Sequence, residues 1–369
     1  TGTFTQMGHK NALSVKKGVK PVVHNRPQEP KPPYPYREEE VTFINTVENF
    51  SLAGTLTLPQ GERPFPAVVL ISGSGQQDRN ETVFMHKPFL VLADHLTRNG
   101  IAVLRYDDRG VGKSKGNAIK ATSLSFADDA EAAVNYLMQR SEINVKKTGL
   151  AGHSEGGLIA PIVASRNRNI AFIVSLAGPG VTGYDVILRQ TEDIMRASGA
   201  AQAEIAETLA TNGQLFHMLI DESDQRKFSK DAMEWYGKEL DKKGLTQEER
   251  QQKMAAFAQG LVSANNPWMR YFLATDPAQF WSQVKCPVLA LNGEKDLQVS
   301  QEINLPAIRA AVRSGGNRKV KTVMLPGLNH LFQHSETGSP DEYIKIEETF
   351  SPGAMELISS WIRKTMKIK

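Results

Sequence analysis

The most specific chemical signal in the sequence is a serine between two glycines. Ser154 lies in the stretch G-H-S-E-G, after a short apolar run and before a segment with helical periodicity. A turn of this kind between strand and helix lifts the serine hydroxyl above the sheet edge, and its glycines avoid clashes with the neighbouring elements. The plain alternative is a glycine-rich link without chemistry, because the short motif also occurs by chance. We favour the interpretation that Ser154 is a nucleophile.

A serine hydroxyl is a weak nucleophile and needs a base, which an acid must orient. The segments N-G-E-K-D and L-P-G-L-N-H each follow an apolar run, and they carry Asp296 and His330. If both runs are strands of one parallel sheet, their carboxyl ends lie at the same edge as Ser154. Each residue alone reads as a turn or surface group, but the three in this order predict a catalytic triad. Glu294 is the alternative acid, and His334 is the only near competitor among the other histidines.

Acyl transfer also needs backbone amides that stabilise the developing oxyanion. The amide of Glu155 comes directly after the nucleophile, at the start of the expected helix. The loop I-S-G-S-G-Q-Q-D-R offers a second amide, because a glycine-rich backbone can turn its N–H groups toward the reacting centre. We favour Ser74 for this amide, with Gly75 as the second choice.

Two segments resemble nucleotide-binding motifs but lack essential residues. In G-S-G-Q-Q-D the third glycine of a dinucleotide fingerprint is replaced by Asp78, and in D-D-R-G-V-G-K-S Asp107 stands where a phosphate loop has its first glycine. The sequence has no metal-binding spacing such as H-E-x-x-H. We therefore expect a reaction without a cofactor or a metal.

Composition narrows the class of protein further. The 369 residues are 40% hydrophobic and 23% charged, and the net charge is only +4, with no basic run interleaved with aromatic residues. A nucleic-acid partner and a membrane span are therefore not expected. The single cysteine, Cys286, forms no internal disulfide. Because the chain begins at Thr1, we interpret it as a processed or truncated product; its location stays open, with export from a bacterium as one expectation.

Apolar strands alternate with helical segments along most of the chain, which predicts a doubly covered, mostly parallel sheet of the α/β class. The expected strands are residues 41–47, 52–58, 67–72, 101–106, 148–152, 170–176, 287–292 and 320–325. The expected helices are residues 87–99, 125–140, 154–165, 301–312 and 352–367.

The same patterns divide the chain into parts. Residues 21–37 contain six prolines and read as an extended linker after a short segment, 1–20. Residues 38–182 and 281–369 form the expected core. Between them, 183–280 contain many helix formers and no convincing strand, which predicts a helical cap over one rim.

The expected cap contains apolar and aromatic residues that could pack or contact a substrate. Packing between helices is the favoured reading for Phe216, Met218, Trp235, Trp268, Tyr271 and Phe272. The last three are the candidates for substrate contact, and a pocket lined by them favours neutral, partly apolar acyl groups.

Taken together, these motifs resemble a known family. Residues 27–366 are similar to bacterial serine esterases of the α/β-hydrolase superfamily with a helical cap, close to the serine-aminopeptidase-like hydrolases. The resemblance rests on S-G-S-G-Q-Q-D-R-N, R-Y-D-D-R-G-V-G-K-S, G-H-S-E-G-G, P-V-L-A-L-N-G-E-K-D-L-Q-V and G-L-N-H-L-F-Q, together with P-Y-P-Y and L-A-G-T-L-T-L-P near the start.

The resemblance implies a triad of Ser154, Asp296 and His330, and mainly structural roles for the D-D-R residues 107–109. It also implies that 1–20 are the last hairpin of an upstream β-rich domain. The implied activity is hydrolysis of carboxylic esters with short acyl groups, with a small-molecule ester as the partner.

Several alternatives stay open on the sequence. An aminopeptidase or amidase needs an acid for the substrate's amino group, such as Glu155 or Glu234. A thioesterase would use the same triad, and a hydrolase-fold binding protein would use none of it. Halide or epoxide chemistry is disfavoured because those relatives carry aspartate at position 154. The natural substrate and the oligomeric state stay undetermined.

Overall fold

The computed structural model describes residues 2–6, 9–13 and 24–368. Strands β1 (Gly2–Gln6) and β2 (His9–Leu13) pair antiparallel as a separate two-stranded sheet. That they are the remnant of an upstream domain remains a prediction. Part of the expected linker, 21–23, lies outside the described residues, and 24–36 contain neither helix nor strand.

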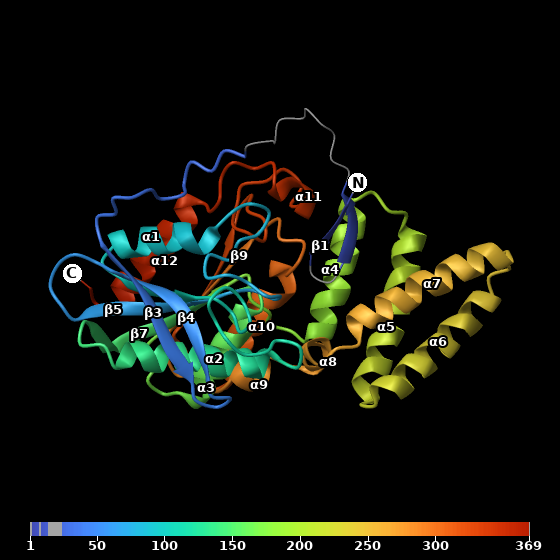
Figure 1. The fold of residues 1–369 in the computed structure, drawn as a ribbon, viewed down its shortest axis with the longest axis horizontal. Helices are drawn as coiled ribbons and strands as arrows, with labels where there is room; N and C mark the ends of the chain where they lie inside the picture. Colours follow the sequence, from blue (N-terminus) through green and yellow to red (C-terminus); the bar gives the residue numbers. More distant parts are fainter. Residues whose placement is uncertain (1, 7–8, 14–23, 369) are drawn as a thin grey trace.

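The main sheet has eight strands in the order β10-β9-β8-β7-β5-β6-β4-β3 (Figure 1). Strand β4 runs antiparallel to both of its neighbours, and all other neighbouring pairs are parallel. The predicted α/β class is therefore confirmed. The strands are β3 (Arg37–Asn45), β4 (Phe50–Leu58), β5 (Phe65–Ile71), β6 (Ala102–Tyr106), β7 (Ile143–His153), β8 (Ile173–Leu176), β9 (Val288–Gly293) and β10 (Val320–Leu325).

Helices cover both faces of the sheet, as Figure 1 shows for α1 and α12 on one side and α2 and α3 on the other. Alternating strand residues face opposite layers: in β5, Val69 packs with the α2, α3 and α10 layer, and Val68 packs with the α1 and α12 layer. Burial on both faces explains why the central strands are apolar nearly throughout. The helices are α1 (Pro88–Arg98), α2 (Ser123–Met138), α3 (Gly156–Arg166), α10 (Gln301–Ser314) and α12 (Pro352–Thr365), with a short α11 (Pro340–Tyr343).

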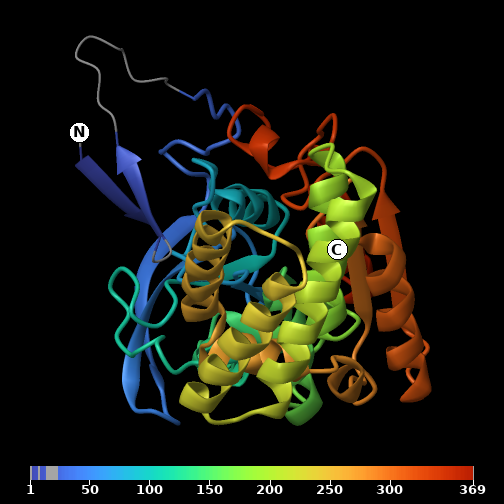
Figure 2. The ribbon, with the colours of Figure 1, turned by 90° about the vertical axis from the view of Figure 1, so that its right-hand side faces the viewer.

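The segment between β8 and β9 is helical throughout its regular structure. Most of it lies to the right of the sheet in Figure 1 and in front of it in Figure 2. Its longer helices share a small core of their own, which includes Leu219, Phe228 and Leu273. That this segment acts as a cap remains a prediction. Its helices are α4 (Gly183–Ala197), α5 (Gln202–Asp221), α6 (Gln225–Asp241), α7 (Gln247–Ala264), α8 (Pro267–Ala274) and α9 (Ala278–Trp281).

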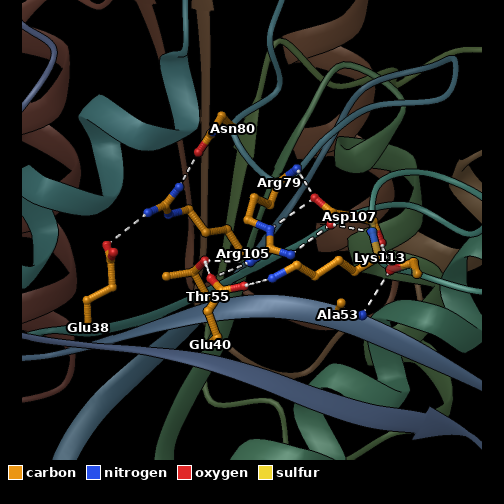
Figure 3. A network of polar contacts seen from close by, with 10 residues as sticks. Glu38, Glu40, Ala53, Thr55, Arg79, Asn80, Arg105, Asp107 and Lys113 are labelled. Carbon is orange, nitrogen blue, oxygen red and sulfur yellow. Dashed lines mark hydrogen bonds and ion pairs between the residues drawn. The ribbon is translucent and has the colours of Figure 1, made fainter.

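A polar network ties the loop after β5 to the antiparallel strands (Figure 3). The Arg79 guanidinium donates to both carboxylate oxygens of Asp107, at 3.0 and 2.8 Å, and to Glu40 at 2.7 Å. Arg105, buried under the same loop, donates to Asn80. The two-pronged contact between Arg79 and Asp107 fixes the orientation of the loop as well as its distance from the sheet.

The next arginine forms a buried ion pair between β6 and α2. Arg109 donates to both oxygens of Asp129, at 2.7 and 3.0 Å, and both side chains are 1% exposed. The guanidinium also lies over the rings of Phe50 and Phe126. These contacts are those of a bracing residue, as the resemblance implies.

We expect Asp129→Ala to lower the free energy of unfolding by about 3–5 kcal/mol, because it leaves a buried guanidinium without its main partner. The neighbouring Asp128→Ala is the matched control, since Asp128 pairs with Arg166 at the surface, and should cost less than about 1 kcal/mol. Urea unfolding of both variants measures the difference. Equal losses would contradict the role assigned to the buried pair.

Candidate active site

Ser154 occupies a strained turn between β7 and α3. Strand β7 ends at His153, α3 begins at Gly156, and Ser154 has a φ of 52°, in the left-handed region. A Cβ atom on Gly152 would lie 2.0 Å from the Gly156 carbonyl oxygen, and one on Gly156 would lie 2.2 Å from that of Ile71. Both positions therefore require glycine, and the turn has the geometry that G-x-S-x-G predicts.

The loops after β9 and β10 bring Asp296 and His330 together. The His330 Nδ1 lies 2.8 Å from the Asp296 Oδ2, and both residues are 4% exposed. The other carboxylate oxygen of Asp296 accepts from the amides of Gln298 and Val299, at 2.8 and 2.9 Å. Because the carboxylate is an acceptor, Nδ1 carries the proton and leaves Nε2 as the basic nitrogen of a neutral imidazole.

The two alternatives from the sequence have other partners. Glu294 is exposed and accepts from the amide of Gly327 at 2.8 Å. The His334 ring pairs with Glu348 at 2.8 Å, and its side chain is 64% exposed. The acid that contacts His330 is therefore Asp296, and His334 lies in a separate surface pair.

Ser154 and His330 are linked through His153, which directly precedes Ser154 in the chain. The His153 Nε2 lies 3.0 Å from the carbonyl oxygen of His330, and the two ring centroids are 4.7 Å apart. Within residues 24–368, no hydrogen bond joins the Ser154 hydroxyl to His330. Such hydrogen bonds are often long without substrate and tighten only in the reacting complex.

The loop that follows β5 lies against the turn. A Cβ atom on Gly73 would lie 3.1 Å from the Cβ of Ser154. Neither the amide of Ser74 nor that of Glu155 donates a hydrogen bond to another described residue. That they stabilise an oxyanion remains a prediction. Asp108 fixes the loop by accepting from the Ser72 hydroxyl at 3.0 Å and the amide of Gln77 at 2.9 Å.

The Glu155 side chain connects the turn to the helical insertion. Its Oε1 accepts from the Ser123 hydroxyl at 2.6 Å and from the indole nitrogen of Trp268, on α8, at 2.7 Å. Glu155 is 3% exposed, and burial raises the pKa of its carboxyl. Together with Asp108 and Tyr106 it lines a small cavity beside the turn.

Of the three candidates for substrate contact, Trp268 and Phe272 pack against the main core. Their rings stack with centroids 5.2 Å apart, and Phe272 is 6% exposed. Tyr271 is half-buried, and burial raises its pKa. Substrate contact by these residues stays a prediction.

Sequence reasoning missed Glu81, whose carboxylate contacts both His153 and the amide of Gly73. It also missed Ser123 as a partner of Glu155. No motif marks Glu81, and the only available signal was the histidine in G-H-S-E-G, which needs a partner when buried.

The eight-stranded, mostly parallel sheet covered by helices and the strained serine turn have the α/β-hydrolase fold. Residues 86–255, which include Ser154 but not Asp296 or His330, match the family model described as serine aminopeptidase, S33. A crystal structure of the α/β hydrolase GrgF from Penicillium superposes with a TM-score of 0.55 at 16% identity, covering 90% of this chain and all of that one. This likeness shows the fold.

Two relatives are similar in sequence. The chain is 28% identical to Esterase EstD of Thermotoga maritima over 317 residues, which are 85% of this chain and 64% of that protein. It is 29% identical to Thiohydrolase aneE of Aspergillus aculeatus over 182 residues, or 46% of this chain and 54% of that protein. The chain thus spans less than two thirds of the length of either relative.

The described residues offer neither a membrane-spanning helix nor a cluster of metal ligands. None of their helices has the length and apolar character needed to cross a membrane. Nor do three or more of their histidine, cysteine, aspartate and glutamate side chains gather where they could hold a metal ion.

We expect Gly156→Ala to destabilise the protein by about 3 kcal/mol, because the new methyl group collides with the backbone of β5. Labelling of Ser154 by a fluorophosphonate should fall in proportion to the loss of folded protein. Gly260→Ala is the control: it lies in α7 with nothing within 4 Å of the added Cβ, and should stabilise by about 0.5–1 kcal/mol. Thermal unfolding and probe labelling measure both effects. A Gly156→Ala variant with the stability and labelling of the wild type would contradict the close packing.

Proposed function

We propose that the chain is a serine hydrolase that cleaves carboxylic esters with short acyl groups. The observation that carries this proposal is the buried pair of Asp296 and His330, with Nδ1 and Oδ2 2.8 Å apart, at the sheet edge where Ser154 is held in its strained turn. The similarity to an esterase over 85% of the chain supports the same activity.

The reaction proceeds in two acyl-transfer steps. His330 takes the hydroxyl proton of Ser154 as the oxygen attacks the ester carbonyl, and the amides of Glu155 and Ser74 donate to the oxyanion. Asp296 holds the imidazole tautomer and stabilises its charged form. His330 then protonates the leaving alcohol and activates the water that releases the acid.

The surroundings of the acids favour ester over aminopeptidase chemistry. The Glu155 carboxyl, one candidate for holding a substrate amine, already accepts from Ser123 and Trp268 and is 3% exposed. The Glu234 side chain is 57% exposed and faces Lys230 on the same helix. Neither acid has the unoccupied, buried position that recognition of an ammonium group requires.

Thioester cleavage is the second candidate. It needs the same nucleophile, base and amides, and the similarity to a thiohydrolase over 46% of the chain supports it. A non-catalytic role is disfavoured because the three triad residues are present and two of them already hydrogen-bond.

We expect Ser154→Ala and His330→Ala each to lower kcat for 4-nitrophenyl acetate by roughly 10⁴- to 10⁶-fold, as loss of a triad member does elsewhere. His334→Ala is the matched control and should retain wild-type activity, because its ring pairs with Glu348 at the surface. Initial rates and fluorophosphonate labelling check the result. Undiminished labelling of Ser154→Ala would refute the assignment of the nucleophile.

A panel of substrates distinguishes the acyl-transfer reactions. We expect kcat/KM to be highest for acetyl and propionyl esters, and aminoacyl 4-nitroanilides to react at least about 100-fold more slowly, since neither Glu155 nor Glu234 is placed to hold the amine. An acetyl thioester with the same acyl group measures the second candidate. Preference for an aminoacyl anilide would favour an aminopeptidase instead.

A further inference from the structure

We propose that Glu81 is a positioning residue, and that with His153 it forms a second acid–histidine pair that fixes the base and the oxyanion loop against the nucleophile. This inference rests on the proposed function. The pair is separate from Asp296 and His330, and neither of its members takes part in the reaction described above.

One carboxylate oxygen of Glu81 contacts two segments of the site. Its Oε1 accepts from the amide of Gly73 at 2.6 Å and contacts the His153 Nδ1 at 2.9 Å. The residue is 3% exposed and has a φ of 53°, a left-handed conformation that a non-glycine residue holds only when its surroundings enforce it. One carboxylate thus joins the loop that carries Ser74 to the residue directly before Ser154.

His153 continues this connection to the base. Its Nε2 lies 3.0 Å from the carbonyl oxygen of His330, which can only accept, so that nitrogen carries a proton. Its Nδ1 faces the carboxylate of Glu81, and the ring satisfies both acceptors at once only as an imidazolium. The chain of contacts runs from Gly73 through Glu81 and His153 to the backbone of His330.

The charges around His153 support this protonation state. Burial would lower the pKa of His153, but the charge and hydrogen bond of Glu81, the His330 carbonyl and the charge of Asp296 raise it above its ordinary value. The His153 ring also packs against the rings of His330 and Phe332, with centroids 4.7 and 6.4 Å away.

The pair supports the base through its backbone. The hydrogen bond from His153 holds the backbone of His330, and Asp296 holds its ring, so the imidazole is fixed from two sides.

The substitution Glu81→Gln tests the pair with little change of shape. The amide oxygen still accepts from Gly73, but without the negative charge His153 becomes neutral and keeps one N–H for two acceptors. We expect kcat per titrated active site to fall by about 10- to 100-fold, the effect of losing one charge-assisted hydrogen bond. KM should stay within about threefold.

Glu348→Gln is the matched control, because Glu348 and His334 form an acid–histidine pair of similar length at the surface, 2.8 Å against 2.9 Å for Glu81 and His153. It should leave kcat and KM unchanged. In a His153→Phe background the loss caused by Glu81→Gln should shrink to less than about threefold, since both changes break one chain of contacts.

A purely structural role predicts a different result. Suppose that Glu81→Gln lowers the number of active sites found by titration but leaves kcat per remaining active site at the wild-type value, or that KM alone changes. In either case the positioning role is wrong. Full additivity with His153→Phe would also overturn it. These outcomes leave the esterase proposal standing, whereas a wild type that neither cleaves esters nor reacts with a fluorophosphonate would refute both.

Discussion

The rest of the site depends on how closely β5, β7 and α3 approach one another at the serine turn. The carbonyl groups of Ile71 and Gly156 occupy the places where side chains of Gly156 and Gly152 would lie. This packing forces Ser154 into a left-handed conformation, which costs about 1–3 kcal/mol for a non-glycine residue. The cost is offset by burial of the two apolar layers on either side of the sheet.

Buried acids surround this turn, and each is stabilised by donors. Asp296 accepts from two amides and His330, Asp108 accepts from Ser72 and Gln77, and Glu155 accepts from Ser123 and Trp268. Burial raises the pKa values of Asp108 and Glu155. These acids therefore position loops and helices. Glu155, which directly follows Ser154, also contacts Trp268 of the helical insertion through its side chain.

The sequence predicted those features that depend on local pattern or on sheet connectivity. The strand-to-helix setting of Ser154 and the order of the loops with Asp296 and His330 both follow from alternating apolar runs. Element bounds were less predictable. Strand β7 begins at Ile143 rather than at residue 148, because the exposed Lys146 and the half-buried Lys147 interrupt its apolar run.

The contacts of Glu81 and Glu155 could not be predicted in this way. His153 lies 72 residues after Glu81, and Trp268 lies 113 residues after Glu155. Only the folded sheet and the placement of the insertion bring these side chains together. Charge and polarity in the sequence indicate that an acid needs a partner when buried, but not which partner it finds.

The two acid–histidine pairs divide the support of the base between its ring and its backbone. Asp296 contacts the His330 ring at Nδ1, and His153 hydrogen-bonds to the His330 carbonyl. The ring gains and loses a proton in each half of the proposed reaction, while neither member of the His153–Glu81 pair exchanges a proton with the substrate. A base that changes charge repeatedly can then keep one geometry, since the backbone contact that holds it does not depend on the protonation of its ring.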